Sequence, residues 1–499
     1  MRLIIILATL SICLLSCENN GGPIEPTPLS DAKELLSITF IYADEDYTTN
    51  IDGTEIALNT ELPAEAKTIE VKSITVSEKS TANVKVEDEI DISDGNFTIT
   101  VTAEDESTQN YLLTATFEDQ LFSVVEYDPV PVAKSYATPV YVHYMPWFQS
   151  QAVSGYWGSH WKMANKNPNN ILSNGRRDIA SHYYPLVEPY DSRDPDYLEY
   201  ALTCIKLAGI DGILIDFYGT SDTYDYPELL EASNDAIEMC EKVGLKFGIV
   251  YEDRTIPNVM NQESREMIEI AQSDLIYMDQ TYFPKDNYIK INNQPVLLNF
   301  GPITVKSNED WLTIFNAIET NINFLPLAYH PQTYDLTTSV DGVYAWVGEI
   351  QTDDLYHYAA QFDITGGGAL FEFKEYYEEG GWGATGQEDI ASDDGSVLKE
   401  TLERAKNANT DFIQLITWND WGEGTAIEPS LDYEYQPLTI VQDFVGMESN
   451  QSNLELTVEL YKKRKEYEGL AYENQQLDQV FYYLISLQID EARTLLNEL

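Results

Sequence analysis

The feature that most constrains this chain is a series of eight short apolar runs, each followed by a longer segment with helical periodicity. Apolar runs that alternate with amphipathic segments are typical of parallel strands joined by helices. Eight such units in succession predict a (β/α)8 TIM barrel, and therefore the α/β fold class. The runs are residues 139–145, 211–218, 245–253, 294–300, 323–330, 341–347, 368–374 and 411–418.

The segments on either side of these runs have a different character. Residues 31–119 contain short runs rich in Thr, Val and Ile with polar turns between them, which predict a small β-sandwich. The ending "TVTAEDESTQNYLLT" resembles the immunoglobulin-like modules at the front of many Bacteroidetes surface lipoproteins. We expect the barrel to occupy 130–445, and a C-terminal extension of two or three helices to occupy 446–499.

The N-terminus predicts export and a lipid anchor. Residues 1–17 hold one Arg, an apolar run and "LLSC", which resembles the lipobox of bacterial lipoproteins and implies cleavage before Cys17 and lipidation of its thiol. A plain secretory signal is the alternative. Residues 18–30 are a Pro- and Gly-containing spacer. We therefore expect a chain held in the bacterial cell envelope, touching the membrane only through its lipid.

The charge of the chain limits its partners. Acidic residues outnumber basic ones 84 to 29, for a formal charge of −55. Such a field repels nucleic acid and anionic polymers, so we expect neutral poly- or oligosaccharides as partners and poor activity on sulfated or uronate-rich polymers. The alternative is that the acidity serves solubility alone. We expect a monomer.

No motif for a metal or a nucleotide is found. The five His residues never occur at a spacing of three or four, and Gly366–Gly368 lacks the Lys-Ser/Thr of a phosphate loop. We therefore expect no metal and no cofactor. Cys204 and Cys240 are either joined by a disulfide or buried as free thiols.

Polar and aromatic side chains gather where the predicted strands end. Catalytic groups of barrel enzymes lie at these carboxyl ends. Aromatic rings cover the apolar faces of sugars, and polar groups hydrogen-bond sugar hydroxyls, so this lining predicts glycan binding. The substrate-binding candidates found in this way are His143, Tyr144, Trp147, Asp216, Tyr218, Tyr251, Glu252, Arg254, Trp346, Trp418, Asn419, Trp421 and Glu428.

The last of these stretches, "ITWNDWGEGTAIEP" at 416–429, crowds carboxylates against indoles. A general acid needs a raised pKa, which a partly desolvated, aromatic-lined site provides. Gly422 and Gly424 give the loop freedom to direct Asp420 and Glu423 at one bond. These two residues are the catalytic candidates.

Four stretches between about residues 133 and 435 resemble the glycoside hydrolase family 71/99-like group, and most of all family 99 endo-acting α-mannosidases and α-mannanases. The stretches are "VHYMPWF", "HWKMANKNP", "IASHYYPLVEPYDSRDPDYLEYAL" and "TWNDWGEGTAIEP". The resemblance implies a retaining, cofactor-free hydrolase in which Glu423 is general acid and then general base. It also implies that Asp420, one methylene shorter than the family's glutamate, deprotonates the sugar 2-hydroxyl to give a 1,2-anhydro sugar. His160 and Trp161 match a substrate-binding pair of the family.

Three functions stay open at this point. The first is an endo-acting hydrolase of α-mannan or a related α-linked glycan. The second keeps the hydrolase but changes the substrate to α-glucan or another polysaccharide. The third is a non-catalytic glycan-binding lipoprotein, which the shortened Asp420 would allow.

Overall fold

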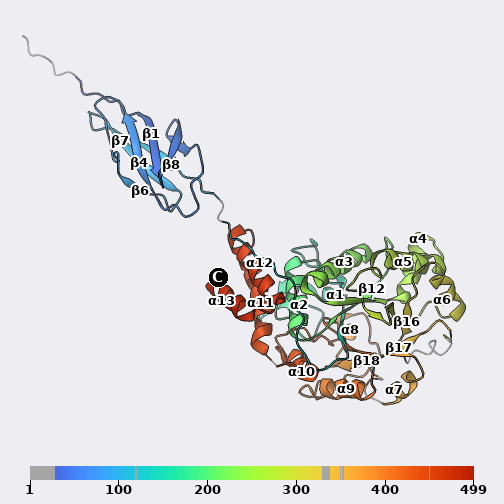
Figure 1. Ribbon diagram of the computed structural model, residues 1–499. Coiled ribbons are helices and arrows are strands. Elements are labelled where there is room, and N and C mark those ends of the chain that lie inside the picture. Colours follow the sequence, from blue (N-terminus) through green and yellow to red (C-terminus); the bar gives the residue numbers. More distant parts are fainter. Residues whose placement is uncertain are drawn as a thin grey trace, which may run out of the picture. The chain divides into compact units, whose positions relative to one another are not determined.

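The computed structural model describes residues 28–118, 121–328, 336, 338–348, 350, 353–448 and 450–499 (Figure 1). The predicted signal peptide and Cys17 lie outside these residues. The chain divides into two compact units, and the division falls between Gln120 and Leu121. Each unit has a hydrophobic core of its own.

Over residues 28–118, the first unit is built only from strands. Alternation of buried and exposed residues along them, as in "TIEVKSITV", places Ile69 and Val71 in the core beside Ile38 and Phe40. Most neighbours pair antiparallel, whereas β3 and β8 pair parallel. The strands are β1 (Leu35–Tyr42), β2 (Glu45–Asp52), β3 (Glu55–Leu58), β4 (Thr68–Val76), β5 (Thr81–Ala82), β6 (Glu89–Asp91), β7 (Asn96–Thr102) and β8 (Thr108–Thr114), in the order β5-β7-β8-β3-β2-β1-β4-β6.

The described residues of the second unit form eight parallel strands, one within or overlapping each predicted apolar run. They are β9 (Val140–Tyr144), β12 (Gly212–Phe217), β13 (Lys246–Tyr251), β15 (Gln294–Asn299), β16 (Asn323–Pro326), β17 (Gly342–Tyr344), β18 (Ile364–Leu370) and β19 (Phe412–Ile416). Their residues are almost all buried, which is usual for parallel strands covered on both faces.

These strands follow one another around a ring. β9, β12, β13, β15 and β16 pair in that order, and β17, β18, β19 and β9 pair in turn. A parallel bridge from Leu327 to Tyr344 joins β16 to β17. The predicted α/β class is confirmed, and all eight strands point their carboxyl ends the same way.

Helices alternate with the strands and surround them in Figure 1. Asp194 caps α2 by accepting the Asp196 N–H, and Gly244 ends α3 with φ of 81°. The longer helices are α2 (Pro195–Leu207), α3 (Tyr226–Val243), α4 (Ile256–Glu263), α5 (Met267–Thr281), α6 (Asn308–Phe315), α7 (Asp353–Ala359), α9 (Ser396–Asn407) and α10 (Gln436–Val445). Shorter elements are α1 (Ser159–Lys162), β10 (Asn167–Ile171), β11 (Arg177–Asp178), η1 (Asp253–Thr255), β14 (Lys290–Ile291) and α8 (Tyr377–Gly380).

The chain closes with α11 (Gln451–Glu466), α12 (Ala471–Ile485) and α13 (Ile489–Glu498). Arg464 of α11 bonds both oxygens of Glu199 on α2, at 3.1 and 2.9 Å, which ties this extension to the outer helices. Cys204 and Cys240 are buried free thiols. Within the described part of the chain, no helix has the length and apolar character that crossing a membrane requires.

Candidate active site

The loop after β19 is held in shape by its own backbone. Ile427 N–H donates to the Thr417 carbonyl at 3.0 Å, and Asp420 N–H donates to Thr417 Oγ1 at 2.8 Å. Gly424 has φ of 66°, and a Cβ there would lie 2.5 Å from the Lys374 carbonyl oxygen. The loop therefore requires glycine at this position.

This loop places Asp420 and Glu423 side by side. The Glu423 N–H donates to Asp420 Oδ1 at 2.8 Å. Burial raises the pKa of Asp420 to about 6, although the N–H groups of Glu423 and Gly422 favour its carboxylate. Burial and the neighbouring charge of Asp420 raise the pKa of Glu423 well above its ordinary value. Glu423 therefore keeps its proton to a higher pH than Asp420 does.

The loop after β18 docks on this pair. Lys374 N–H donates to the Glu423 carbonyl at 2.9 Å, and Tyr376 N–H donates to the Gly422 carbonyl at 2.8 Å. The Tyr377 hydroxyl lies 3.5 Å from Glu423 Oε1, whereas the buried Glu423 Oε2 has no protein partner among the described residues. One carboxyl oxygen of Glu423 is therefore left for a substrate or water.

A second carboxylate pair lies at the ends of β12 and β13. Asp216 is buried, its carboxyl oxygens have no hydrogen-bond partner in the described residues, and burial together with Glu252 raises its pKa. Glu252 Oε2 lies 2.6 Å from Arg254 Nε. The positive charge of Arg254 partly opposes the effect of burial, because it favours the ionised forms of Asp216, Asp420 and Glu423. This half-exposed guanidinium is the cation that Asp216, Glu252, Asp420 and Glu423 share.

A series of contacting aromatic rings lies near these acids. Trp147 stacks on His160 with ring centroids 4.0 Å apart and contacts Tyr218 at 6.2 Å. Trp382 meets the His160 edge at 5.5 Å and lies 5.9 Å from Tyr377, which contacts Glu423. Trp382 is 47% exposed, so the edge of this aromatic group faces solvent.

His143 and Trp346 lie deeper in the strand ring. Their rings are 4.8 Å apart, and His143 Nδ1 lies 3.2 Å from Gln414 Oε1. Burial lowers the pKa of His143 to about 4, so this ring is neutral at pH 7. The centroid of the Phe300 ring lies 5.0 Å from that of Trp346, and the guanidinium of Arg254 lies over the Phe300 ring.

Three other predicted site residues lie in a buried tyrosine cluster instead. The Tyr190 hydroxyl donates to Glu428 Oε2 at 2.7 Å, and the indole N–H of Trp421 donates to the Tyr190 hydroxyl at 3.0 Å. Trp418 donates to Tyr197 at 3.3 Å. Glu428 is 1% exposed and Trp418 0%, so these side chains are buried in the protein interior, where they support the loop.

The remaining predicted residues are also buried or hydrogen-bonded to other segments of the protein. Tyr144 is fully buried near Glu428, and the Trp161 indole donates to the Tyr190 carbonyl at 2.8 Å. Tyr251 donates to Asp274 of α5 at 2.8 Å. Asn419 accepts from the Met145 N–H at 2.8 Å and returns a bond to its carbonyl at 3.0 Å, which ties the loop to the end of β9.

Three residues at the site were not predicted from the sequence: Phe300, Tyr377 and Trp382. The last two belong to "KEYYEEGGWGATGQE", residues 374–388, which directly follows the seventh strand. A stretch with aromatics and four glycines at a strand exit was the available signal. Phe300 directly follows Asn299 and ends the apolar run 294–300, so its ring could not be distinguished from a core side chain by sequence alone.

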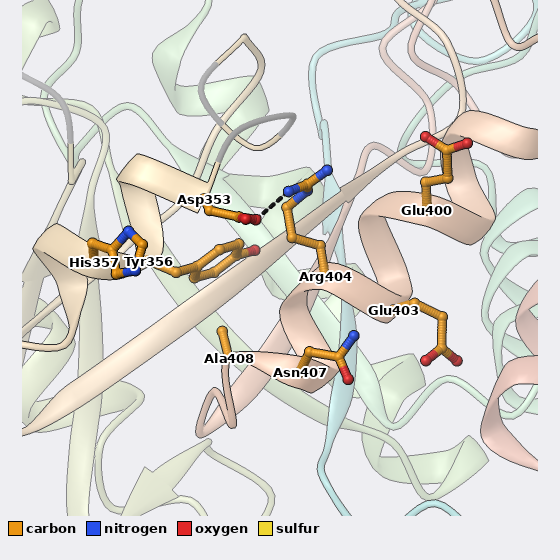
Figure 2. A pocket seen from close by; sticks show the side chains of 8 residues that line it. All are labelled: Asp353, Tyr356, His357, Glu400, Glu403, Arg404, Asn407 and Ala408. Carbon is orange, nitrogen blue, oxygen red and sulfur yellow. Dashed lines mark hydrogen bonds and ion pairs between the residues drawn. The ribbon is translucent and has the colours of Figure 1, made fainter.

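A cavity of about 640 Å³ lies elsewhere, between α7 and α9 in the outer helix layer. Figure 2 shows Arg404 directed at Asp353, with His357 and Tyr356 on the opposite wall and Glu400 and Glu403 along α9. None of these residues was a site candidate. Among the described residues, no cluster of three His, Cys, Asp or Glu side chains is arranged to hold a metal ion.

No family model matches the chain. The chain is similar to a zebrafish (Danio rerio) glycoprotein endo-alpha-1,2-mannosidase-like protein, with 34% identity over 110 residues, 19% of this chain. It spans a quarter of that relative's length (25%). Among solved structures, it is similar to a GH99 endo-alpha-mannosidase from Bacteroides thetaiotaomicron, with 16% identity, TM-score 0.47, and 72% of this chain and 100% of that one covered. A glycoside hydrolase-like protein follows, with 14% identity, TM-score 0.46, and 64% and 98% covered.

Proposed function

We propose that this protein is a retaining, endo-acting glycoside hydrolase of the family 99 type, with a (β/α)8 barrel and α-mannan or a related neutral α-linked glycan as substrate. The observation that carries the proposal is the loop after β19, where Asp420 and Glu423 lie together and Glu423 keeps a buried oxygen without a protein partner. The 34% identity to an endo-alpha-1,2-mannosidase-like protein supports the choice of substrate.

In the proposed reaction, Glu423 donates its proton to the glycosidic oxygen as the bond to the leaving sugar breaks. Asp420 accepts the proton of the 2-hydroxyl, whose oxygen closes on the anomeric carbon to give a 1,2-anhydro sugar. Glu423, now a carboxylate, then takes a proton from water, which opens the anhydro ring at the anomeric carbon, and Asp420 returns its proton to the 2-oxygen. The raised pKa of Glu423 suits the first step.

The aromatic group supplies the proposed binding surface. Trp147, His160, Tyr218 and Trp382 offer ring faces and edges to pyranose rings. Arg254, Glu252 and Asp216 offer charged partners for hydroxyls. Tyr144, Trp161, Tyr251, Trp418, Trp421 and Glu428 are assigned to support of this surface, since each is buried among protein partners.

The deciding experiment is mass spectrometry of products from α-mannans, α-glucans and defined oligosaccharides, with wild type, Glu423→Gln and Glu388→Gln. Glu388 is an exposed glutamate of the neighbouring loop and is the matched control. We expect internal cleavage of mannan by wild type and Glu388→Gln, and loss of turnover with sugar binding kept in Glu423→Gln. An unimpaired Glu423→Gln enzyme would sink the proposed mechanism.

Asp420 favours a second candidate, because its side chain is one methylene shorter than the glutamate of the family motif. Activity on α-glucan alone would mean that Asp420 marks a change of substrate. Glycan binding with no released reducing ends across the whole panel would favour a non-catalytic glycan-binding protein.

We also propose that Cys17 carries a lipid that holds the protein in the bacterial cell envelope. The support is the lipobox-like "LLSC". Mass spectrometry of the N-terminal peptide from cells expressing wild type and Cys17→Ser tests this. A wild-type peptide that keeps residues 1–16, or lacks a lipid on Cys17, would refute the anchor.

A further inference from the structure

A cavity of about 190 Å³ lies between the β10–β11 hairpin and Tyr376 of the loop after β18. Among the described residues that line it are Lys166, Arg176, Arg177 and His182, but only one carboxylate, Asp178. The chain as a whole has 84 acidic and 29 basic residues, so the excess of basic side chains in this lining is opposite to the charge balance of the whole chain. Such a reversal points to a ligand of negative charge.

Aromatic faces hold the three permanent cations of this lining in place. Each cationic head lies over a ring, and a ring attracts a cation without neutralising its charge. The pairs are Lys166 over Tyr376 at 5.6 Å, Arg176 over Tyr184 at 5.4 Å, and Arg177 over Trp157 at 5.3 Å. The heads are therefore positioned before a ligand arrives, which reduces the entropy lost on binding.

The positive charge is only partly compensated by protein carboxylates. Lys166 pairs with Asp178 at 3.0 Å, and Arg176 lies 3.8 Å from Asp432. Arg177 makes no ion pair with any described residue, and its guanidinium donates once, to the Pro168 carbonyl at 3.0 Å. A guanidinium carries five N–H donors in a fork that fits oxyanions. Arg177 thus has donors to spare.

The cavity adjoins the catalytic loop on two sides. Tyr376, which forms one wall, donates its N–H to the carbonyl of Gly422 beside Glu423. Tyr183, also in the lining, lies so near the other side that a Cβ on Gly424 would be 3.2 Å from its ring. The lining of this cavity therefore contacts the loop that carries Glu423.

We propose that this cavity binds a phosphate- or sulfate-type oxyanion carried as an ester on an otherwise neutral glycan, with Arg177 as its main ligand and Arg176 and Lys166 as its flank. Liquid water occupies about 30 Å³ per molecule, so about 190 Å³ holds a tetrahedral oxyanion with part of a sugar ring. At 0.15 M salt the repulsion from distant carboxylates is screened beyond about 8 Å, whereas these contacts are not. A glycan with a single ester is therefore repelled less by the acidic protein than a polyanion is.

The role as a substrate subsite rests on the proposed glycosidase function, but oxyanion binding itself does not. The first experiment is therefore calorimetric titration of the full chain with inorganic phosphate and with sulfate at 0.15 M salt. The proteins are wild type, Arg177→Gln and Arg404→Gln, with circular dichroism to check folding. Arg404 lines the acidic cavity of Figure 2 and is the matched control. We expect saturable binding that weakens at least tenfold in Arg177→Gln and is unchanged in Arg404→Gln.

The second experiment compares binding of a neutral mannan oligosaccharide with the same oligosaccharide bearing one phosphate or one sulfate ester, using the Glu423→Gln variant. Tighter binding of one ester, lost when Arg177→Gln is added, identifies the ester. No saturable binding of either anion, or equal binding by wild type and Arg177→Gln, overturns the proposal. Anion binding by a protein that cleaves no glycan would refute the glycosidase instead, so the two failures are distinguishable.

Discussion

At the residue scale, the candidate chemistry depends on the protonation states of two carboxyl groups in one loop, those of Asp420 and Glu423. Asp420 accepts the N–H of Glu423 and is held near it, so the two carboxyls cannot both ionise cheaply. Glu423 retains its proton to a higher pH than Asp420, whose pKa lies at about 6. In the proposed mechanism, burial and backbone hydrogen bonds thus make Glu423 the acid and Asp420 the base.

This order of ionisation predicts a bell-shaped dependence of kcat/KM on pH. Activity should rise as Asp420 loses its proton near pH 6 and fall at higher pH as Glu423 loses its own. Asp420→Asn should keep the loop, because its amide oxygen still accepts the Glu423 N–H, but lower kcat about 10²–10⁴-fold. Rates on mannan oligosaccharides between pH 4 and 10 provide the check. A flat profile, or full activity in Asp420→Asn, would contradict this assignment.

Glu428 provides a residue-scale test of stability. Burial raises its pKa to about 8, so the folded state binds a proton that the unfolded state releases from about pH 4.3 upward. Stability from this group is complete below about pH 4 and is lost as pH rises to about 8. Relative to wild type, Glu428→Gln should gain on the order of 2–4 kcal/mol between pH 5 and pH 8.5.

Urea unfolding of both proteins at pH 5 and pH 8.5 measures this difference. Glu400→Gln, which changes an exposed glutamate of α9, is the control and should match wild type at both values. Parallel pH dependence in wild type and Glu428→Gln would show that Glu428 is ionised in the folded protein throughout this range.

At the element scale, the closing helices are held to the outer layer by a buried charge pair. Arg464 of α11 contacts Glu199 of α2 through two nitrogens and Asp478 of α12 at 2.8 Å. Glu199 is buried and burial raises its pKa to about 7, against the opposing charge of Arg464. Three helices therefore meet at one guanidinium.

Arg464→Met should destabilise the second unit by about 3–5 kcal/mol, because Glu199 is then a buried carboxylate with no cation. The double variant Arg464→Met, Glu199→Leu should regain most of that loss, since no lone charge is left. Denaturant unfolding measures both, and Lys462→Met on the exposed face of α11 is the control. Equal losses in the single and double variants would mean that packing, and not charge, joins these helices.

At the scale of the whole molecule, the chain consists of two units with separate cores. The described residues of the first form only strands, and the second contains every residue assigned to the candidate site. Separate cores imply separate cooperative unfolding, because each unit buries apolar side chains of its own.

Calorimetry of the intact protein should therefore show two transitions. The piece that begins at Leu121 should keep its own transition within about 2 °C and its activity on mannan unchanged, since its core is complete. A single transition for the intact chain, or loss of folding in the piece, would show that the units depend on one another.

The α/β class, the approximate positions of the eight parallel strands and the loop that holds Asp420 and Glu423 could be predicted from the sequence, although the seventh predicted run, 368–374, begins four residues after the start of β18 at Ile364–Leu370. These features are local: apolar runs are read residue by residue, and the carboxyl end of a strand follows from its position in the chain. The same local pattern predicted Trp147 and Tyr218 as binding residues, and the family resemblance predicted His160; in the structure, Trp147 contacts both of the other rings.

Only the tertiary structure decided which aromatic side chains face the acids and which support them. Trp418, Trp421 and Glu428 belong to the same short stretch as Glu423, yet they bond to Tyr190 and Tyr197, which lie more than 200 residues earlier. Tyr377 and Trp382 reach the site because the loop after β18 hydrogen-bonds to the Glu423 loop. The direction of a side chain at a loop is set by contacts with distant segments, and those contacts exist only once the chain has folded.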